Sequence, residues 1–128
     1  MDRDLPDVVA EVTAVFEIYE RALIANDVEL LVDLFLDSPG TIRYGIGDMQ
    51  HGHDEIARYR RASEVAAPPR DLQHTVISTF GRDVAVVNTE FVPHGTDVLG
   101  RQSQTWIRTR DGWRVACAHV SWLGGRGP

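Results

Sequence analysis

The spacing of apolar residues changes once along this chain, from a helical period to a strand period. Through most of residues 1–62, apolar side chains recur every three or four positions, as on one face of a helix. From Leu72 onward they alternate with polar residues, as in half-buried strands. Helices placed ahead of an antiparallel run are typical of the α+β class. The sequence therefore predicts three helices packed on a curved antiparallel sheet.

Residues that break the pattern set the expected bounds of the elements. Helices are expected over about residues 6–25, 27–37 and 53–62, and strands over about 41–46, 73–80, 84–92, 100–110 and 113–123. Gly47 to Gly52 are predicted to form a turn, and Asp111-Gly112 is a strong hairpin signal. The 128 residues suit a single domain over 1–128, with a flexible tail at about 124–128.

Several features indicate a cytoplasmic protein. The start of the chain is acidic, unlike a signal or transit peptide. No apolar run approaches the ~18 residues that a membrane helix needs. Cys117 is the single cysteine, so no internal disulfide can form, which suits the cytoplasm. Its place in a predicted strand favours a small buried core residue over a nucleophile.

The charged residues are distributed unevenly. All 13 basic residues are arginines. Residues 1–37 hold ten acids and two arginines, a net −8, and the rest of the chain carries +2, which sums to −6. The sequence predicts that these acids form a solvated helical face. Such a face would repel nucleic acid and anionic membranes, so neither is an expected partner.

Motifs for cofactors, metals and covalent catalysis are missing. The chain has no GxSxG, phosphate-loop or dinucleotide-binding glycine pattern. Among five histidines only His51 and His53 are close together, in the predicted turn, and no cysteine cluster supports them. We therefore expect no metal, no cofactor and no catalytic residues.

Some polar residues are nevertheless candidates for a pocket. Arg43 and Arg60 could anchor an anion, because guanidinium pairs well with carboxylate. A strand as polar as residues 101–106 implies a wet pocket, a hydrogen-bonded interface or simple exposure. Strict alternation would place His119 on one face with Val115 and Cys117, as a hydrogen-bonded core or interface residue or as a pocket base. The candidate pocket residues are Arg43, Tyr44, Arg60, Gln102, Gln104 and His119.

Several segments resemble known families. Glu11–Ala14, Tyr19–Leu23 and Gly52 with Glu55-Ile56 resemble nuclear-transport-factor-2-like (NTF2-like) proteins. The narrower resemblance lies in Arg43–Gly45, Thr79–Asp83, Gly100–Trp106 and Ala118–Ser121. These look like the oxalurate-catabolism accessory proteins of the HpxZ type and the small subunit of 1-carboxybiuret hydrolase, AtzH. The resemblance spans nearly the whole chain, but the tail 122–128 is not a feature of that group.

The resemblance implies a cone-shaped fold that dimerises through its sheet face. It also implies a non-catalytic subunit that binds and stabilises an amidase-signature enzyme acting on a small ureide, in a complex with two copies of each chain. The amidase could be 1-carboxybiuret hydrolase, an oxalurate-pathway enzyme or another member. Two alternatives stay open, because one fold hosts many functions. One is a stand-alone isomerase, dehydratase or cyclase with His119 or Asp83 as base, and the other is a small-carboxylate-binding protein.

Overall fold

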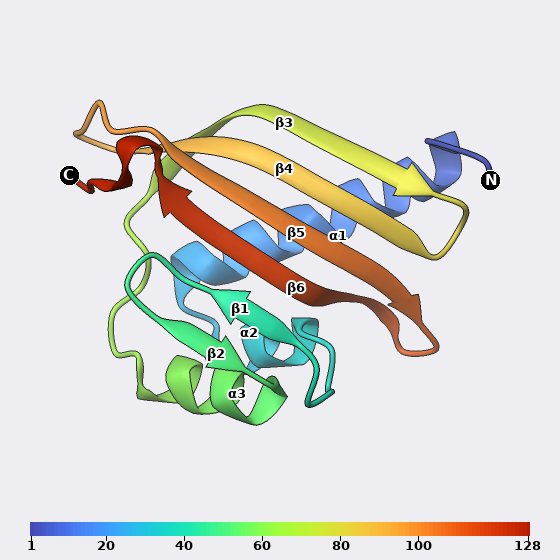
Figure 1. Ribbon diagram of the computed structural model, residues 1–128, viewed down its shortest axis with the longest axis horizontal. Helices are drawn as coiled ribbons and strands as arrows, with labels where there is room; N and C mark the ends of the chain where they lie inside the picture. Colours follow the sequence, from blue (N-terminus) through green and yellow to red (C-terminus); the bar gives the residue numbers. More distant parts are fainter.

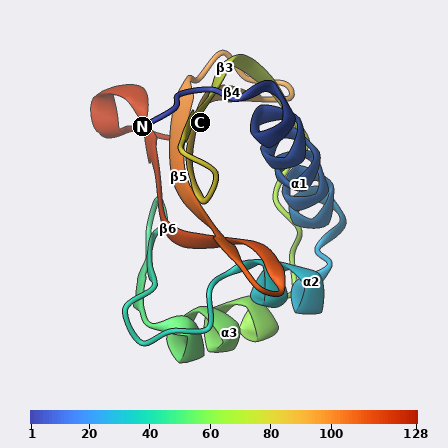
Figure 2. The same cartoon turned by 90° about the vertical axis from the view of Figure 1, so that its right-hand side faces the viewer.

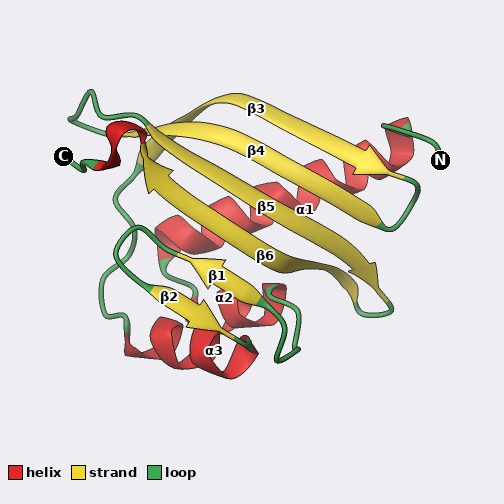
Figure 3. Ribbon diagram, in the orientation of Figure 1, coloured by secondary structure: helices red, strands yellow, loops and turns green.

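The computed structural model describes residues 1–128 and confirms the α+β class, with helices and strands largely segregated along the chain (Figures 1 and 3). The α-helices are α1 (Pro6–Ala25), α2 (Val28–Leu34) and α3 (His53–Ala62), and a short 3₁₀ helix, η1 (Leu123–Gly125), follows the last strand. The strands are β1 (Ile42–Tyr44), β2 (Met49–His51), β3 (Arg70–Phe80), β4 (Val84–Pro93), β5 (Gly100–Thr109) and β6 (Gly112–Trp122). They form one six-stranded sheet in the order β2-β1-β6-β5-β4-β3.

The helices cover one face of this sheet and one of its ends. Helix α1 runs along the inner face of β3 to β6 (Figure 2). Helices α2 and α3 lie together at the bottom of that view, beyond the C-terminal end of α1. Pro6 stands in the first turn of α1, where its missing N–H costs nothing. Asn26 ends the helix in the left-handed conformation, with φ of 51°. None of the helices is long and apolar enough to span a bilayer.

A single cluster of 14 buried residues joins the helices to the sheet. At its centre is Trp106 of β5, which is 0% exposed and packs edge-on against Tyr19 of α1, with ring centroids 6.1 Å apart. Phe35 also packs against Tyr19, with ring centroids 6.2 Å apart. The alternation of β5 is as predicted: Gln102, Gln104 and Trp106 face inward and are buried.

The predicted sheet is wrong in one respect, because it is mixed and not wholly antiparallel. β1 runs parallel to β6, with Arg43 opposite Ala118 and Tyr44 opposite His119. β1 also pairs with β2, which lies within the segment predicted to be only a turn. Each of these two strands has three residues, too few to display a period of two.

Two β-bulges bend the sheet around α1. One lies in β3, between Gln73 and Val76, where His74 has a φ of 50°. The other lies in β6, where Thr105 pairs with Cys117 but Trp106 pairs with Val115, so that Ala116 is the extra residue. Bulges of this kind increase curvature and twist, which lets an open sheet become one wall of a cone.

The bulge in β6 corrects two predictions. Strict alternation placed Cys117 and His119 on the face of Val115, and Cys117 in the core. Because Ala116 resets the alternation, Val115 is 0% exposed, whereas Cys117 and His119 are both exposed. Ala118 faces inward instead and packs against the core cluster.

The acids of α1 are not simply solvated. Glu11 receives a bond of 2.6 Å from Arg108 of β5, and Asp7 pairs with Arg82. Glu20 pairs with Arg70 of β3, and its side chain is only 14% exposed, so the prediction of a solvated face is wrong for this residue. Sheet arginines thus neutralise part of the acidic helix across the α1–sheet boundary.

Candidate functional site

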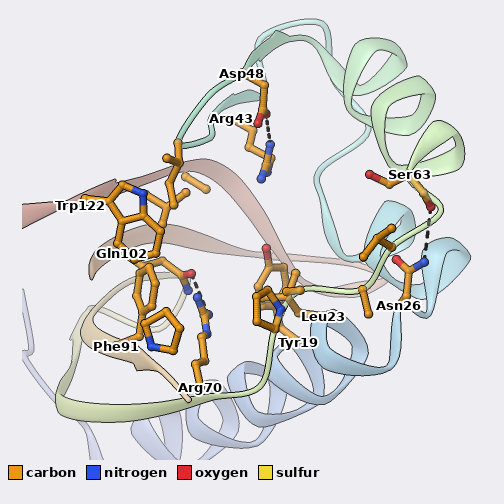
Figure 4. A pocket seen from close by; sticks show the side chains of 18 of the residues that line it. Tyr19, Leu23, Asn26, Arg43, Asp48, Ser63, Arg70, Phe91, Gln102 and Trp122 are labelled. Atoms are coloured by element: carbon orange, nitrogen blue, oxygen red, sulfur yellow. Dashed lines mark hydrogen bonds and ion pairs between the residues drawn. The ribbon is translucent and has the colours of Figure 1, made fainter. Parts of the chain in front are cut away.

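A cavity of about 530 Å³ lies inside the cone, between α1, α3 and the inner face of the sheet (Figure 4). All six predicted pocket residues line it: Arg43, Tyr44, Arg60, Gln102, Gln104 and His119. Three further cavity residues were not predicted from the sequence, namely Tyr19, Asp48 and Arg70. Their partners are distant in sequence or lie on strands that were not expected. Three arginines from three different elements therefore share one hollow.

Arg43 of β1 is held by an acid of its own hairpin. Its Nη1 donates to Asp48 at 2.6 Å and to Gln50 at 2.8 Å, and its guanidinium lies over the Tyr59 ring, 4.9 Å from the centroid. Burial alone would raise the pKa of Asp48, but the bonds from Gln50, Arg43 and Tyr59 outweigh it and lower the pKa below the usual value. Asp48 therefore stays ionised and neutralises Arg43.

Arg70, at the start of β3, is held in a second buried network. Its Nη2 donates to Glu20 at 2.6 Å and to Gln102 at 3.0 Å, and its guanidinium lies 4.4 Å from the centroid of the Phe91 ring. The Arg70 side chain is 7% exposed. Figure 4 shows Arg70 with Gln102, and Arg43 with Asp48, as separate groups on the cavity wall.

Arg60 of α3 differs from the other two arginines. It is 7% exposed but makes no ion pair, and its one hydrogen bond, from Nη2 to the Tyr19 hydroxyl, is 3.4 Å long. Its Nε is buried without any partner, and so is Nε2 of Gln104. The site thus holds two satisfied arginines and one that is not.

Tyr44 and His119 are the exposed members of the predicted set. They are opposite each other in the β1–β6 register, and their rings meet edge-on with centroids 5.6 Å apart. No carboxylate pairs with His119. Asp83, the other candidate base, does not line the cavity; it is 74% exposed and pairs with Arg108 at 3.3 Å.

The rest of the wall is mainly apolar and includes the end of the chain. Its apolar members are Leu23, Ile46, Val65, Ala66, Ala67, Pro68, Phe91, Pro93, Ala118, Val120, Trp122 and Pro128. Trp122 packs on Phe91, with ring centroids 5.5 Å apart. The predicted flexible tail thus contributes Pro128 to the wall, although its flexibility stays a prediction. No three His, Cys, Asp or Glu side chains gather as a metal site.

Known proteins share this architecture. A protein from Pectobacterium atrosepticum, described as a DUF3225-family protein of unknown function, is 46% identical over 95% of each chain, with a TM-score of 0.91. A cystatin-like-fold protein from Burkholderia xenovorans is 47% identical over 96% of this chain and 97% of that one, with a TM-score of 0.90. An NTF2-like superfamily protein from Salmonella enterica is 25% identical over 91% of each chain, with a TM-score of 0.71. The search of curated proteins gives no significant match.

The sequence also matches a family model over nearly its whole length. The matched segment is residues 1–126, so it contains every helix, every strand and the whole cavity apart from Pro128. The fold is NTF2-like, as the resemblance implied, and the narrower resemblance is confirmed as well. This chain belongs to the AtzH-like family.

Proposed function

We propose that the chain is a non-catalytic small subunit that binds and stabilises an amidase-signature hydrolase acting on a small ureide such as 1-carboxybiuret. The observation that carries the proposal is the AtzH-like match over residues 1–126. A match that includes all the secondary structure favours a shared role more strongly than a shared fold does, since one fold serves many functions.

The chemistry of the cavity supports a role without turnover. A general base works best with a pKa near the working pH, but the pKa of Asp48 is lowered and its charge is committed to Arg43. Glu20 is likewise committed to Arg70. His119, the remaining candidate, has no acid to orient it.

The outer face of the sheet fits the expected homodimer. No α-helix covers this face, and it carries the exposed side chains of Met49, Val76 and Val84, which are 67%, 54% and 39% exposed. Cys117 and Thr105 lie opposite each other near its centre. An uncovered sheet face with exposed apolar side chains is the contact that we propose for a second copy, and two copies would then carry two amidase chains in the cytoplasm.

The test is co-expression with an amidase-signature protein from the same genome. Size exclusion with light scattering should show one complex with two copies of each chain, and ureide hydrolysis should appear only in that peak. A homodimer that does not bind the amidase would contradict the proposal. So would turnover of a ureide by the chain alone at about 1 s⁻¹, an ordinary enzymatic rate.

A further inference from the structure

The Arg60 side chain is a buried cation without a counter-charge. A charged group buried in protein is normally paired, because the desolvation that it suffers is otherwise uncompensated. Arg43 and Arg70 obey this rule, with acids at 2.6 Å each. Arg60 does not obey it, although it is 93% buried, at 7% exposure. Its position at the cavity wall suggests that its partner comes from outside the chain.

A second unused donor lines the same cavity, and its orientation is fixed. The indole Nε1 of Trp106 donates to Oε1 of Gln104 at 3.0 Å. An indole N–H can only donate, so it must face the amide oxygen and thereby defines which end of the amide is the NH₂ group. That NH₂ group is buried and unpartnered, and Gln104 is 1% exposed.

Tyr19 contacts both Arg60 and Trp106, the indole that is bonded to Gln104. Its hydroxyl accepts the bond from Arg60 and donates to no group of the chain, and its ring packs on Trp106. A hydroxyl that accepts one bond still has its own proton to give. Arg60, Gln104 and Tyr19 thus keep N–H and O–H donors for which the chain supplies no acceptor.

We propose that the cavity binds a small organic monocarboxylate, with its carboxylate on Arg60, Gln104 and Tyr19 and its apolar body against Leu23, Ala118 and Val120. A carboxylate is an acceptor-only group that satisfies several donors and supplies the missing negative charge. The apolar wall excludes a highly charged ligand such as a polyphosphate. A cavity of about 530 Å³ lies within the usual range for small-molecule sites.

The experiment uses three acids, namely acetate, butyrate and benzoate, each beside its neutral amide. Binding to the full-length chain is measured by calorimetry and by the shift in melting temperature. At least one acid should bind with a Kd of about 1 mM or below, and its amide should bind at least tenfold more weakly. If no acid binds, or if the amides bind as well as the acids, the proposal is wrong.

Two variants locate the site, and one variant serves as a control. Arg60→Met should weaken binding at least tenfold while leaving the unliganded melting temperature unchanged or higher, since removal of an unpaired buried charge is often neutral or stabilising. Gln104→Glu keeps the side-chain volume and the acceptor for Trp106, but replaces the free donor with a negative charge, and it should also abolish binding. Arg58→Met, an exposed arginine on the same helix, should bind as the parent does.

Binding that survives in both Arg60→Met and Gln104→Glu would overturn the proposal. If one variant fails to fold, the other still decides the question. The test needs no amidase, so its failure can be told apart from failure of the subunit proposal. Repeating it on the co-purified complex would show whether the ligand and the amidase are bound together.

Discussion

The inner and outer faces of the sheet differ in what covers them, although the same strands form both. On the inner face, α1 lies against Trp106, and charged groups are buried in pairs such as Arg70 with Glu20. On the outer face no α-helix is present, and neighbouring polar groups such as Ser103 and Asn88 meet in exposed cross-strand contacts. The inner face therefore determines whether the chain folds, whereas the outer face is available for association.

The largest expected effect is on the inner face, at Trp106. Trp106→Ala removes the largest fully buried side chain and should lower the free energy of unfolding by about 3–5 kcal/mol. Ser103→Ala, on the outer face of the same strand, should change it by less than about 0.5 kcal/mol. Urea denaturation of both variants measures the contrast, and similar losses would remove the distinction between the faces.

The next effect concerns the buried ion pair. Glu20→Ala removes the carboxylate that accepts from Arg70 and Gln102, and leaves Arg70 with only the Gln102 amide oxygen. It should cost about 2–4 kcal/mol of stability, because a buried charge loses its counter-charge. Glu17, one turn earlier on α1, is exposed and unpaired, so Glu17→Ala is the matched control. A small effect at both positions would mean that α1 is held by apolar contacts alone.

A smaller effect, visible through pH, is expected at Asp48. A carboxyl whose folded pKa is lowered stabilises the fold above its unfolded pKa, and that contribution is lost as the pH falls through the folded value. Asp48→Asn should therefore lower the free energy of unfolding by about 1–3 kcal/mol at neutral pH. The difference from the parent should shrink as the pH falls below the ordinary value of 3.8. A difference that stays constant with pH would contradict the assignment to Asp48.

The smallest effect in free energy is expected on the outer face. Thr105→Arg places a charge near the centre of the proposed dimer contact and should weaken self-association at least tenfold, about 1.4 kcal/mol. Sedimentation velocity over a concentration series measures this change. Ala14→Arg, on the exposed side of α1, should leave the dimer intact. Dimers of equal strength in both variants would show that the sheet face is not the contact.

The sequence predicts the long elements better than the short ones, for a physical reason. A helix of 20 residues or a strand of ten shows its period many times over, and α1, α3 and the four long strands lie close to their predicted bounds. β1 and β2, with three residues each, exist because β6 and α3 hold them in place, and their own residues carry no periodic signal.

The candidate site shows the same division. Residue type and strand alternation were enough to select Arg43, Gln102 and Gln104, and all of them line the cavity. The state of each arginine could not be predicted, because it depends on partners that only the fold brings near. Arg70 meets Glu20 across 50 residues of chain, and Arg60 meets no acid at all. Similarly, the exposure of Cys117 follows from a bulge that no alternating pattern can reveal.

The bulge at Ala116 also determines at which position of β6 a residue can be deleted without turning the other side chains to the opposite face. Residues on either side of it follow two alternations that are out of phase by one position. Loss of the codon at the bulge would leave every other side chain of β6 on its present face and remove only the bend. Loss of a codon between residues 118 and 122 would instead turn residues from the cavity to the opposite surface. Related sequences that differ in length within this strand should therefore differ at the bulge.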